Sequence, residues 1–245
     1  MDRRELFKLS ASSLLVPALT EGRLAPVEAQ PLSVLTKPWA PRHTVWSLPQ
    51  SPVRRLAWTV DDGGSLSSLK SYTDLLKRHP YLRMTFFVTS TYSTWRSIHR
   101  YLQPLVDTGQ VQLANHTHTH ADLTRLSSTQ IGHELNSCRH FIYEYYGVKS
   151  QPFFRPPFGY YNDYVIRSAA AVGYYTPVMW YGTLGDSGSI TGHRVVELAK
   201  AYFHDEALII GHSNNLTASS RFDDLLKLIR NRALKTVTLN DVWRS

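Results

Sequence analysis

Residues 56–64 read Leu-Ala-Trp-Thr-Val-Asp-Asp-Gly-Gly, and the predicted fold starts from this stretch. Residues 56–60 form a short apolar and β-branched run, which is typical of a buried strand. Leucines and a tyrosine then recur at helical intervals as far as His79-Pro80, where a helix must stop. The sequence therefore predicts a buried strand, a turn that carries two aspartates, and a helix.

Strand and helix continue to alternate along the rest of the chain. Further strands are expected at residues 84–88, 111–114, 153–154, 174–180, 207–210 and 236–239. Further helices are expected at 95–105, at 129–146 before Gly147, after the caps Asn162 and Thr191, and after a cap at Ser220. This alternation favours parallel strands with crossover helices. About seven units predict an α/β fold, an incomplete (β/α)7 barrel of distorted TIM-like form; an open doubly wound sheet is the competing arrangement.

The composition limits the function classes. The chain has 245 residues, 42% of them hydrophobic, which is enough for one sizeable core. The 27 lysines and arginines exceed the 19 acidic residues and give a formal charge of +8, but they are scattered. The scatter argues against nucleic-acid binding and is consistent with a weakly anionic polymer as partner. The single cysteine, Cys138, excludes an intrachain disulfide and has the apolar neighbours of a core thiol.

The first 29 residues resemble a twin-arginine export signal. Arg3 and Arg4 precede a mildly apolar stretch over residues 9–19, and Val27-Glu28-Ala29 resembles a cleavage site. We therefore expect a protein that is exported to the periplasm or secreted, with no integral membrane segment. Residues 30–52 are rich in proline and predict a linker that wraps onto a catalytic domain over residues 53–245.

Two clusters carry the residue types of a metal site. Asp61 and Asp62 follow the first predicted strand, and adjacent carboxylates there are suited to a cation or to acid–base work; a solvated turn is the alternative. His116 and His120 follow the third strand and are four residues apart, so one helical turn would place both on one face. Imidazoles at that spacing commonly bind zinc, and a carboxylate can complete an open three-ligand site.

Three more chemically active residues follow other strands. Arg155 follows the fourth strand, Asp186 lies beyond the fifth, and His212 follows the sixth. The carboxyl ends of parallel strands meet at one mouth of a barrel, which is where such folds place their active sites. We therefore expect these residues and the two clusters to converge.

At this point the chain resembles the polysaccharide deacetylase family, which shares the NodB homology domain and is carbohydrate esterase family 4. The resemblance rests on five segments in family order, Thr59-Val60-Asp61-Asp62-Gly63, His116-Thr117-His118-Thr119-His120, Arg155-Pro156-Pro157-Phe158-Gly159, Asp186 and Ile210-Gly211-His212. They span most of the chain after the export signal. The first three are the specific ones.

The resemblance implies a metal-dependent hydrolase. Asp62, His116 and His120 would hold a divalent metal, most often zinc, although two histidines and a carboxylate also accept iron, cobalt or nickel. The metal would lower the pKa of a bound water and polarise the acetyl carbonyl. Asp61 would act as the general base that takes the proton from this water.

The remaining family residues imply how the reaction is completed. The backbone N–H of Phe158 would help to stabilise the developing oxyanion, and His212 would protonate the leaving amine or alcohol. Arg155, paired with Asp186, would orient Asp61. An unreactive ion pair between Arg155 and Asp186 is the alternative.

One departure concerns the acetate pocket. The family usually has a tryptophan directly after the aspartate of its fourth motif, and this chain has Ser187 there. The pocket is therefore expected to be wider, or to be closed by Trp180 or Tyr181.

The sequence thus predicts an exported deacetylase that removes N-acetyl groups from an amino-sugar polymer, such as peptidoglycan or a chitin-like glycan. An O-acetyl esterase acting on xylan or an exopolysaccharide is the nearest alternative. A non-catalytic glycan-binding protein is the alternative from another class.

Overall fold

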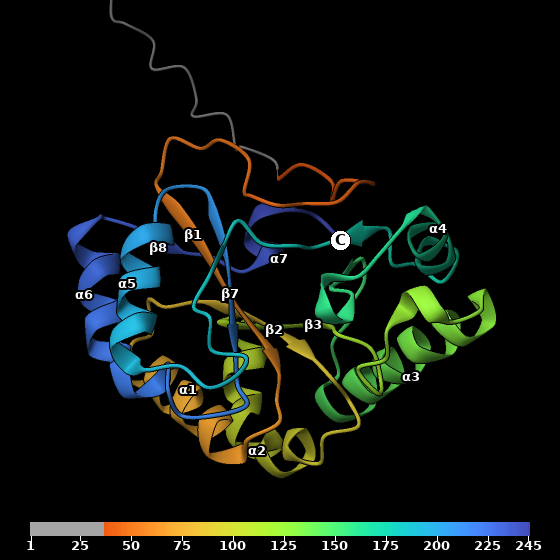
Figure 1. Ribbon diagram of the computed structural model, residues 1–245, viewed down its shortest axis with the longest axis horizontal. Coiled ribbons are helices and arrows are strands. Elements are labelled where there is room, and N and C mark those ends of the chain that lie inside the picture. Colours follow the sequence, from red (N-terminus) through yellow and green to blue (C-terminus); the bar gives the residue numbers. More distant parts are fainter. Residues whose placement is uncertain (1–36) are drawn as a thin grey trace, which may run out of the picture. The chain divides into compact units, whose positions relative to one another are not determined.

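β1 (Arg55–Asp62) is the central strand of a parallel sheet (Figure 1). The computed structural model describes residues 37–245. The other strands in this part of the chain are β2 (Met84–Val88), β3 (Val111–Asn115), β4 (Phe153–Phe154), β5 (Thr176–Pro177), β6 (Gly182–Thr183), β7 (Ala207–His212) and β8 (Lys235–Thr236). Their order is β5-β4-β3-β2-β1-β7-β6, and β8 pairs with the start of β1. Every strand pairing is parallel.

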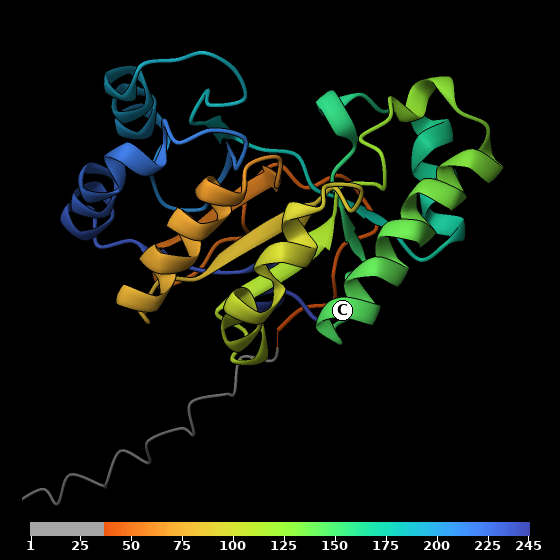
Figure 2. The same ribbon diagram turned by 90° about the horizontal axis from the view of Figure 1, so that it is seen from below.

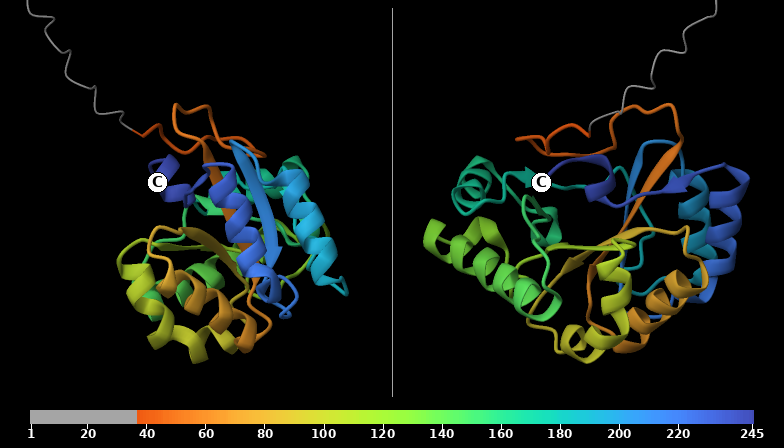
Figure 3. Two further views of the ribbon diagram at one scale, coloured as in Figure 1. Left: turned by 90° about the vertical axis from the view of Figure 1, so that its left-hand side faces the viewer. Right: turned by 180° about the vertical axis from the view of Figure 1, so that it is seen from behind.

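The helices cover the outer face of this sheet. They are α1 (Leu66–Arg78), α2 (Thr94–Asp107), α3 (Ser128–Tyr146), α4 (Asp163–Ala171), α5 (Gly192–Tyr202) and α6 (Phe222–Asn231). The short α7 (Leu239–Val242) instead packs Leu239 and Val242 into a second core on the inner side of the sheet. From β1 to β5 each new strand is added on the same side, so successive right-handed crossovers place their helices on one face. The sheet curls away from them (Figures 2 and 3). This confirms the incomplete (β/α)7 barrel and shows that the open doubly wound sheet is wrong.

Side chains alternate between two cores along the central strands. Trp58 and Phe86 face the helices, whereas their neighbours Ala57 and Phe87 belong to a smaller core inside the curl of the sheet. Asp61 is four residues after Ala57 on the same strand, so its side chain also faces the inner side of the sheet. Cys138 is confirmed as a core thiol, because it is fully buried and burial raises its pKa to about 12.

Local sequence signals define most helix ends. The Ser127 side chain accepts a hydrogen bond from the backbone of α3, which ends at Gly147 in a left-handed conformation with φ of 68°. Asn162 caps α4 and Thr191 caps α5 in the same way as Ser127. These ends agree with the predicted caps and stops.

The predicted strand over residues 174–180 is wrong, because only Thr176–Pro177 forms a strand there, β5, and the next strand, β6, begins at Gly182. The carbonyls of Val178 and Met179 accept hydrogen bonds from the buried Arg155 side chain, at 2.9 and 3.0 Å. The chain therefore bends around this guanidinium instead of continuing one ladder. Only a distant residue causes this break, so the local pattern does not reveal it.

Two predictions near the carboxyl end are also wrong. Ser220 does not cap the last long helix; its hydroxyl donates to the carbonyl of Thr217 in a short turn before α6. The strand expected at 236–239 ends at Thr236, because Thr238 instead caps α7 in a reciprocal pair with Asp241.

Residues 37–52 cross the end of the sheet at which the strands begin (Figure 1). Val45 pairs with Val178 and Ser47 pairs with Ala207, and the Val45 side chain is buried. The predicted export signal over residues 1–29 and the start of the predicted linker lie outside the described residues. Within residues 37–245, no helix is long and apolar enough to cross a membrane.

The ion pair between Arg83 and Asp241 fastens α7 to the start of β2. Arg83 Nε donates to Asp241 Oδ2 at 2.6 Å and its Nη2 donates to Oδ1 at 2.8 Å. Burial raises the pKa of Asp241, but the hydrogen bonds from Arg83 and Thr238 outweigh burial and hold the pKa below its ordinary value of 3.8.

We expect Asp241→Asn to lower the free energy of unfolding by about 1 kcal/mol at pH 7, because it removes a two-point ion pair that is partly exposed. A lowered folded-state pKa stabilises the protein above the unfolded pKa, and this contribution is lost as the pH falls through the folded value. Urea unfolding should therefore show a difference between the two proteins that shrinks below pH 4. A difference that grows on acidification would contradict this assignment.

Candidate functional site

Asp61 and Asp62 are the last two residues of β1, not the first residues beyond it. Asp61 is 1% exposed and Asp62 is 5% exposed. Asp62 has a φ of 78° and Gly63 a φ of 98°, so the chain turns sharply. The Trp95 indole donates to the carbonyl of Asp62 at 2.8 Å and fills the space that a side chain at residue 63 would occupy. Only glycine fits there.

His116 and His120 are brought together by a loop, so the predicted helical turn is wrong. Thr117 and His120 have φ values of 72° and 62°, in the left-handed region. The Asn115 side chain accepts from the Thr117 N–H at 2.8 Å, and the Thr117 hydroxyl accepts from the His120 N–H at 3.1 Å. The two imidazole rings lie 4.9 Å apart.

Glu134 of α3 holds this loop from behind. Its carboxylate is mostly buried and accepts hydrogen bonds from the N–H groups of His118 and Thr119 and from the Thr119 hydroxyl, at 2.8 to 2.9 Å. The His118 ring bonds to the Ser90 hydroxyl at 2.8 Å instead of joining the other two histidines. One carboxylate therefore fixes the middle of the loop.

Asp62, His116 and His120 form a cluster that fits a divalent metal. Their ligand atoms lie within 4.8 Å of one another. Among the described residues, no hydrogen-bond donor reaches the buried Asp62 Oδ1, which lies 3.4 Å from Nε2 of His116 and 3.3 Å from Nε2 of His120. Nδ1 of His116 bonds to the carbonyl of Arg155 at 2.8 Å, so its Nε2 faces the cluster. Zinc commonly binds imidazole and carboxylate ligands. A hydrogen bond from the second ring nitrogen of a histidine ligand, as in His116, orients the ring toward the metal.

The charges within the cluster favour the metal-binding protonation states of Asp62 and His120. Burial lowers the pKa of His116, but Asp61 and Asp62 outweigh burial and raise it. Burial raises the pKa of Asp62, but the His116 imidazole outweighs burial and holds the pKa well below its ordinary value. Burial and the neighbouring His116 together lower the pKa of His120. An ionised carboxylate and a neutral imidazole are the forms that bind a metal.

Arg155 holds Asp61 in a saturated network. The guanidinium is fully buried, and its Nη1 donates to Asp61 Oδ1 at 2.6 Å and to the Thr59 hydroxyl at 2.8 Å. Its other nitrogens donate to the carbonyls of Val178 and Met179. The carboxylate orientation is therefore fixed, and Asp61 Oδ2 lies 3.6 Å from Nε2 of His116.

Asp186 pairs with His212, so its predicted pairing with Arg155 is wrong. Asp186 Oδ1 lies 3.1 Å from His212 Nδ1, and its Oδ2 accepts from the His212 N–H at 3.1 Å. Burial lowers the pKa of His212, but the bond to Asp186 and the charges of Asp61, Asp186 and Asp62 outweigh burial and raise it. The pairing leaves Nε2 of His212 free to face the cavity.

The two aspartates and three histidines described above line one cavity of about 530 Å³. Its walls are Asp61, Asp62, Tyr92, His116, His120, Pro156, Phe158, Gly159, Tyr160, Trp180, Thr183, Ser187, Ile210, His212 and Asn214. Six of the eight predicted site residues line it. Arg155 and Asp186 lie behind the wall, each bonded to a residue that lines it.

The outer half of the cavity is aromatic. The Phe158 side chain is 58% exposed, and its ring centroid lies 4.6 Å from that of His120. Trp180 lines the same cavity, and a side chain at Gly159 would approach its ring to 2.9 Å. Ser187 is exposed at the rim, whereas Tyr181 packs against Tyr202 and His204 outside the lining. Trp180 is therefore the aromatic wall, and the side of Ser187 is open.

Two residues of the site were missed by the sequence reasoning. The Asn214 side chain donates to Asp62 Oδ2 at 2.6 Å and accepts from the Gly64 N–H at 3.0 Å. Glu134 supports the histidine loop as described above. An acid among Ile131, Leu135 and Cys138 on the buried face of α3 is the signal that could have identified Glu134. The sequence around Asn214 contains no comparable pattern that could have identified this residue.

A family model described as polysaccharide deacetylase matches residues 49–177, more than half of the chain. The chain belongs to the polysaccharide deacetylase family. It is 28% identical over 139 residues to a peptidoglycan-N-acetylmuramic acid deacetylase of Bacillus subtilis, covering 57% of this chain and 51% of that protein. It is 24% identical over 247 residues to a peptidoglycan-N-acetylglucosamine deacetylase of Listeria monocytogenes, covering 97% and 50%. The chain thus spans about half the length of these relatives.

Solved structures of carbohydrate esterase family 4 share the fold. The Bacillus subtilis peptidoglycan deacetylase named above has a TM-score of 0.72 at 22% identity, covering 82% of this chain and 85% of that one. A family 4 esterase from Streptomyces lividans in complex with acetate has a TM-score of 0.67 at 22% identity, covering 76% and 93%. A family 4 pseudoenzyme from Bacillus anthracis has a TM-score of 0.72 at 18% identity, covering 82% and 69%.

We expect Glu134→Gln to weaken zinc binding on the order of tenfold, because removing the partner of an orienting hydrogen bond typically costs 10–100-fold in metal affinity. The amide cannot accept all three hydrogen bonds that the carboxylate accepts. Competition with a chromogenic chelator measures the affinity directly. Glu144→Gln is the matched control, because Glu144 is an exposed acid on the same helix, and it pairs with the exposed His140 and not with the histidine loop. Equal zinc affinity in the native and Glu134→Gln proteins would contradict the support role.

Proposed function

We propose that this protein hydrolyses N-acetyl groups of an amino-sugar polymer, such as peptidoglycan or a chitin-like glycan, with a divalent metal held by Asp62, His116 and His120. The observation that carries the proposal is that one cavity contains this cluster together with the Asp61 carboxylate and the His212 imidazole, each held by its own buried partner. The family membership and the peptidoglycan deacetylases among the relatives support the same chemistry.

The metal would be zinc, although iron, cobalt or nickel also fit two imidazoles and a carboxylate. When bound, such an ion supplies Lewis-acid activation of water and of the acetyl carbonyl. The protein supplies the proton transfers. Asp61, held by Arg155, accepts a proton from the attacking water through Oδ2.

His212 acts as the general acid in the same cavity. Asp61 and His212 are register partners on neighbouring strands, so they reach the same bond from adjacent positions. Asp186 fixes Nδ1 and leaves Nε2 to protonate the leaving amine, without which an amide nitrogen leaves poorly. The Phe158 N–H is proposed to donate to the developing oxyanion.

The remaining parts of the proposal concern the whole chain. Residues 1–29 are proposed to act as a twin-arginine export signal, residues 30–52 as a wrapping linker and residues 53–245 as the catalytic domain. The protein would then work in the periplasm or outside the cell.

One observation favours a second candidate, an O-acetyl esterase that acts on xylan or an exopolysaccharide. Ser187 leaves one side of the cavity open at the position where the family usually carries a tryptophan. Acetate release from acetylated xylo-oligosaccharides, compared with N-acetylated chitooligosaccharides and peptidoglycan fragments, separates the two chemistries. A glycan-binding protein without turnover is a third reading, since one solved neighbour is a pseudoenzyme. The complete acid–base pair in the cavity argues against it.

We expect Asp61→Asn to lower acetate release by the zinc-loaded protein on the order of 10²–10⁴-fold, because it removes the general base. Asp223→Asn, an exposed aspartate on α6, is the matched control and should retain full activity. Zinc content and the melting temperature of each variant separate loss of the base from loss of the metal or the fold. Unchanged acetate release in Asp61→Asn would refute the mechanism.

We expect Asp186→Asn to shift the alkaline limb of the kcat/KM profile to lower pH by about one unit, because it removes the anion that raises the pKa of His212. A general acid must be protonated, so a lower pKa ends activity at a lower pH. The profile should be measured beside His212→Gln, which should lose this limb. An alkaline limb that stays in place in Asp186→Asn would contradict the role of His212 as the acid.

A further inference from the structure

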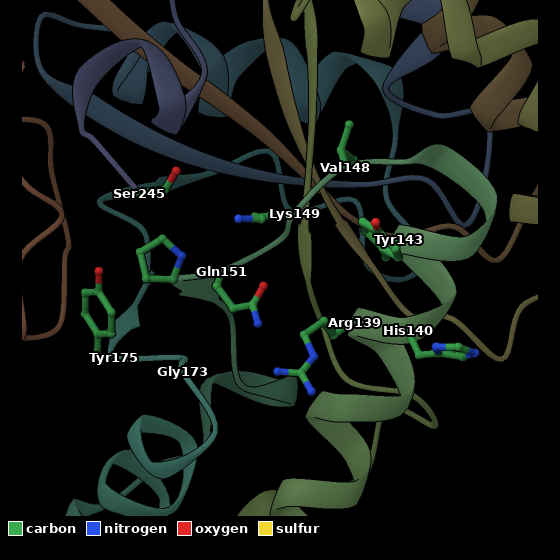
Figure 4. A pocket seen from close by; sticks show the side chains of 10 residues that line it. Arg139, His140, Tyr143, Val148, Lys149, Gln151, Gly173, Tyr175 and Ser245 are labelled. Atoms are coloured by element: carbon green, nitrogen blue, oxygen red, sulfur yellow. The ribbon is translucent and has the colours of Figure 1, made fainter.

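A second cavity of about 540 Å³ lies away from the site described above (Figure 4). We call it the basal pocket. It is lined by Arg139, His140, Tyr143, Val148, Lys149, Gln151, Pro152, Gly173, Tyr175 and Ser245. Within residues 37–245, none of its lining residues belongs to the first cavity.

The basal pocket is at the opposite end of the strands from the proposed catalytic site. Gln151 precedes β4, whereas Arg155 follows it. Tyr175 directly precedes β5. The pocket thus lies at the amino ends of these parallel strands, and Asp61 and His212 lie at the carboxyl ends of theirs. A ligand there would not compete for the reaction cavity.

Two cationic side chains, Arg139 and Lys149, line the basal pocket. No aspartate or glutamate side chain lines it, and within residues 37–245 neither Arg139 nor Lys149 forms an ion pair. Glu144, an acid on the same helix, pairs with His140 at 3.3 Å. The Arg42 guanidinium lies 4.5 Å from the centre of the Tyr175 ring, which adds a cation at the edge.

The arrangement of polar and aromatic groups is suited to more than a simple anion. Figure 4 shows Arg139, Lys149 and Gln151, from α3 and the segment before β4, around one space, with Tyr175 on its far side. A guanidinium and an ammonium bind a carboxylate, and a side-chain amide both donates to and accepts from hydroxyl groups. Tyr175 and the exposed Tyr143 add flat rings with polar ends.

We propose that the basal pocket binds an acidic glycan through a carboxylate-bearing sugar unit. Arg139 and Lys149 take the carboxylate, Gln151 takes ring hydroxyls, and Tyr143 and Tyr175 contact the sugar ring. The formal charge of +8 attracts such a polymer at long range, and the pocket recognises one unit of it. Binding at this end of the sheet would keep the protein on a polymer while the reaction cavity remains free.

The test is calorimetric binding of oligogalacturonate, whose uronic acid units carry carboxylates, to the full chain at 150 mM salt. We expect binding by the native protein, and at least a tenfold weaker affinity in Arg139→Gln/Lys149→Gln, because charged hydrogen bonds are lost. Tyr143→Ala should also weaken binding, since a ring contact is lost. Neutral N-acetylchitooligosaccharides should not compete at the basal pocket.

Lys227→Gln/Arg230→Gln is the matched control. It removes the same charge from exposed positions on α6, which have no ion-pair partner within residues 37–245. This control should bind as the native protein does. Equal weakening in both double variants would show that only the net charge matters and would overturn the proposal. Absence of binding by the native protein, or binding that Arg139→Gln/Lys149→Gln leaves unchanged, would also overturn it. Acetate release from a short neutral substrate should be unaffected in every variant, so this test does not depend on the proposed activity.

Discussion

The buried ion pair between Arg155 and Asp61 is the constraint on which the rest of the site depends. A guanidinium with no exposed surface is stable only if its donors are paired, because an unpaired buried charge is destabilising by several kcal/mol. Here the protein supplies the Asp61 carboxylate, the Thr59 hydroxyl and two backbone carbonyls. Those partners come from β1 and from the chain that follows β5, so satisfying one side chain joins three parts of the sheet. The same network bends the chain between β5 and β6 and points Asp61 into the cavity.

The sequence could predict the fold because the strands are short, buried and parallel. Each reads as an apolar run, and α1, α3 and α4 have side-chain caps, so local signals and global arrangement agree over most of the chain from β1 to α4. The prediction was wrong over residues 174–180, where the carbonyls of Val178 and Met179 bond to Arg155 instead of to a strand. It was also wrong at Ser220 and after Thr236, where side-chain bonds to nearby backbone compete with the expected elements. The partner is distant in the sequence only in the case of Arg155; the partners of Ser220 and Thr238 lie three residues away.

The candidate site could be predicted to a similar degree. Residue types at strand ends located Asp61, Asp62, His116, His120 and His212, because the carboxyl ends of parallel strands share one mouth. The pairing of the two buried partners could not be predicted. Arg155 and Asp186 each follow a strand, but register places Arg155 beside Asp61 and Asp186 beside His212. The support from Glu134 also depends on how α3 packs behind the loop.

The cavity has a buried half and an exposed half, and different constraints act on the residues of the two halves. Asp61, Asp62 and His116 are each at most 5% exposed and are bonded to further buried groups, so a change in any one of them disturbs several neighbours. The side chains of Phe158 and Tyr160 are more than half exposed, and Ser187 is exposed at the rim of the cavity. Substitution there changes the contact with substrate without disturbing the buried network. We therefore expect the buried half to set the proposed chemistry and the exposed half to set the choice of polymer and acyl position. The open side at Ser187 lies in that second half, so we expect it to influence which group is removed in the proposed reaction and to leave the buried network unchanged.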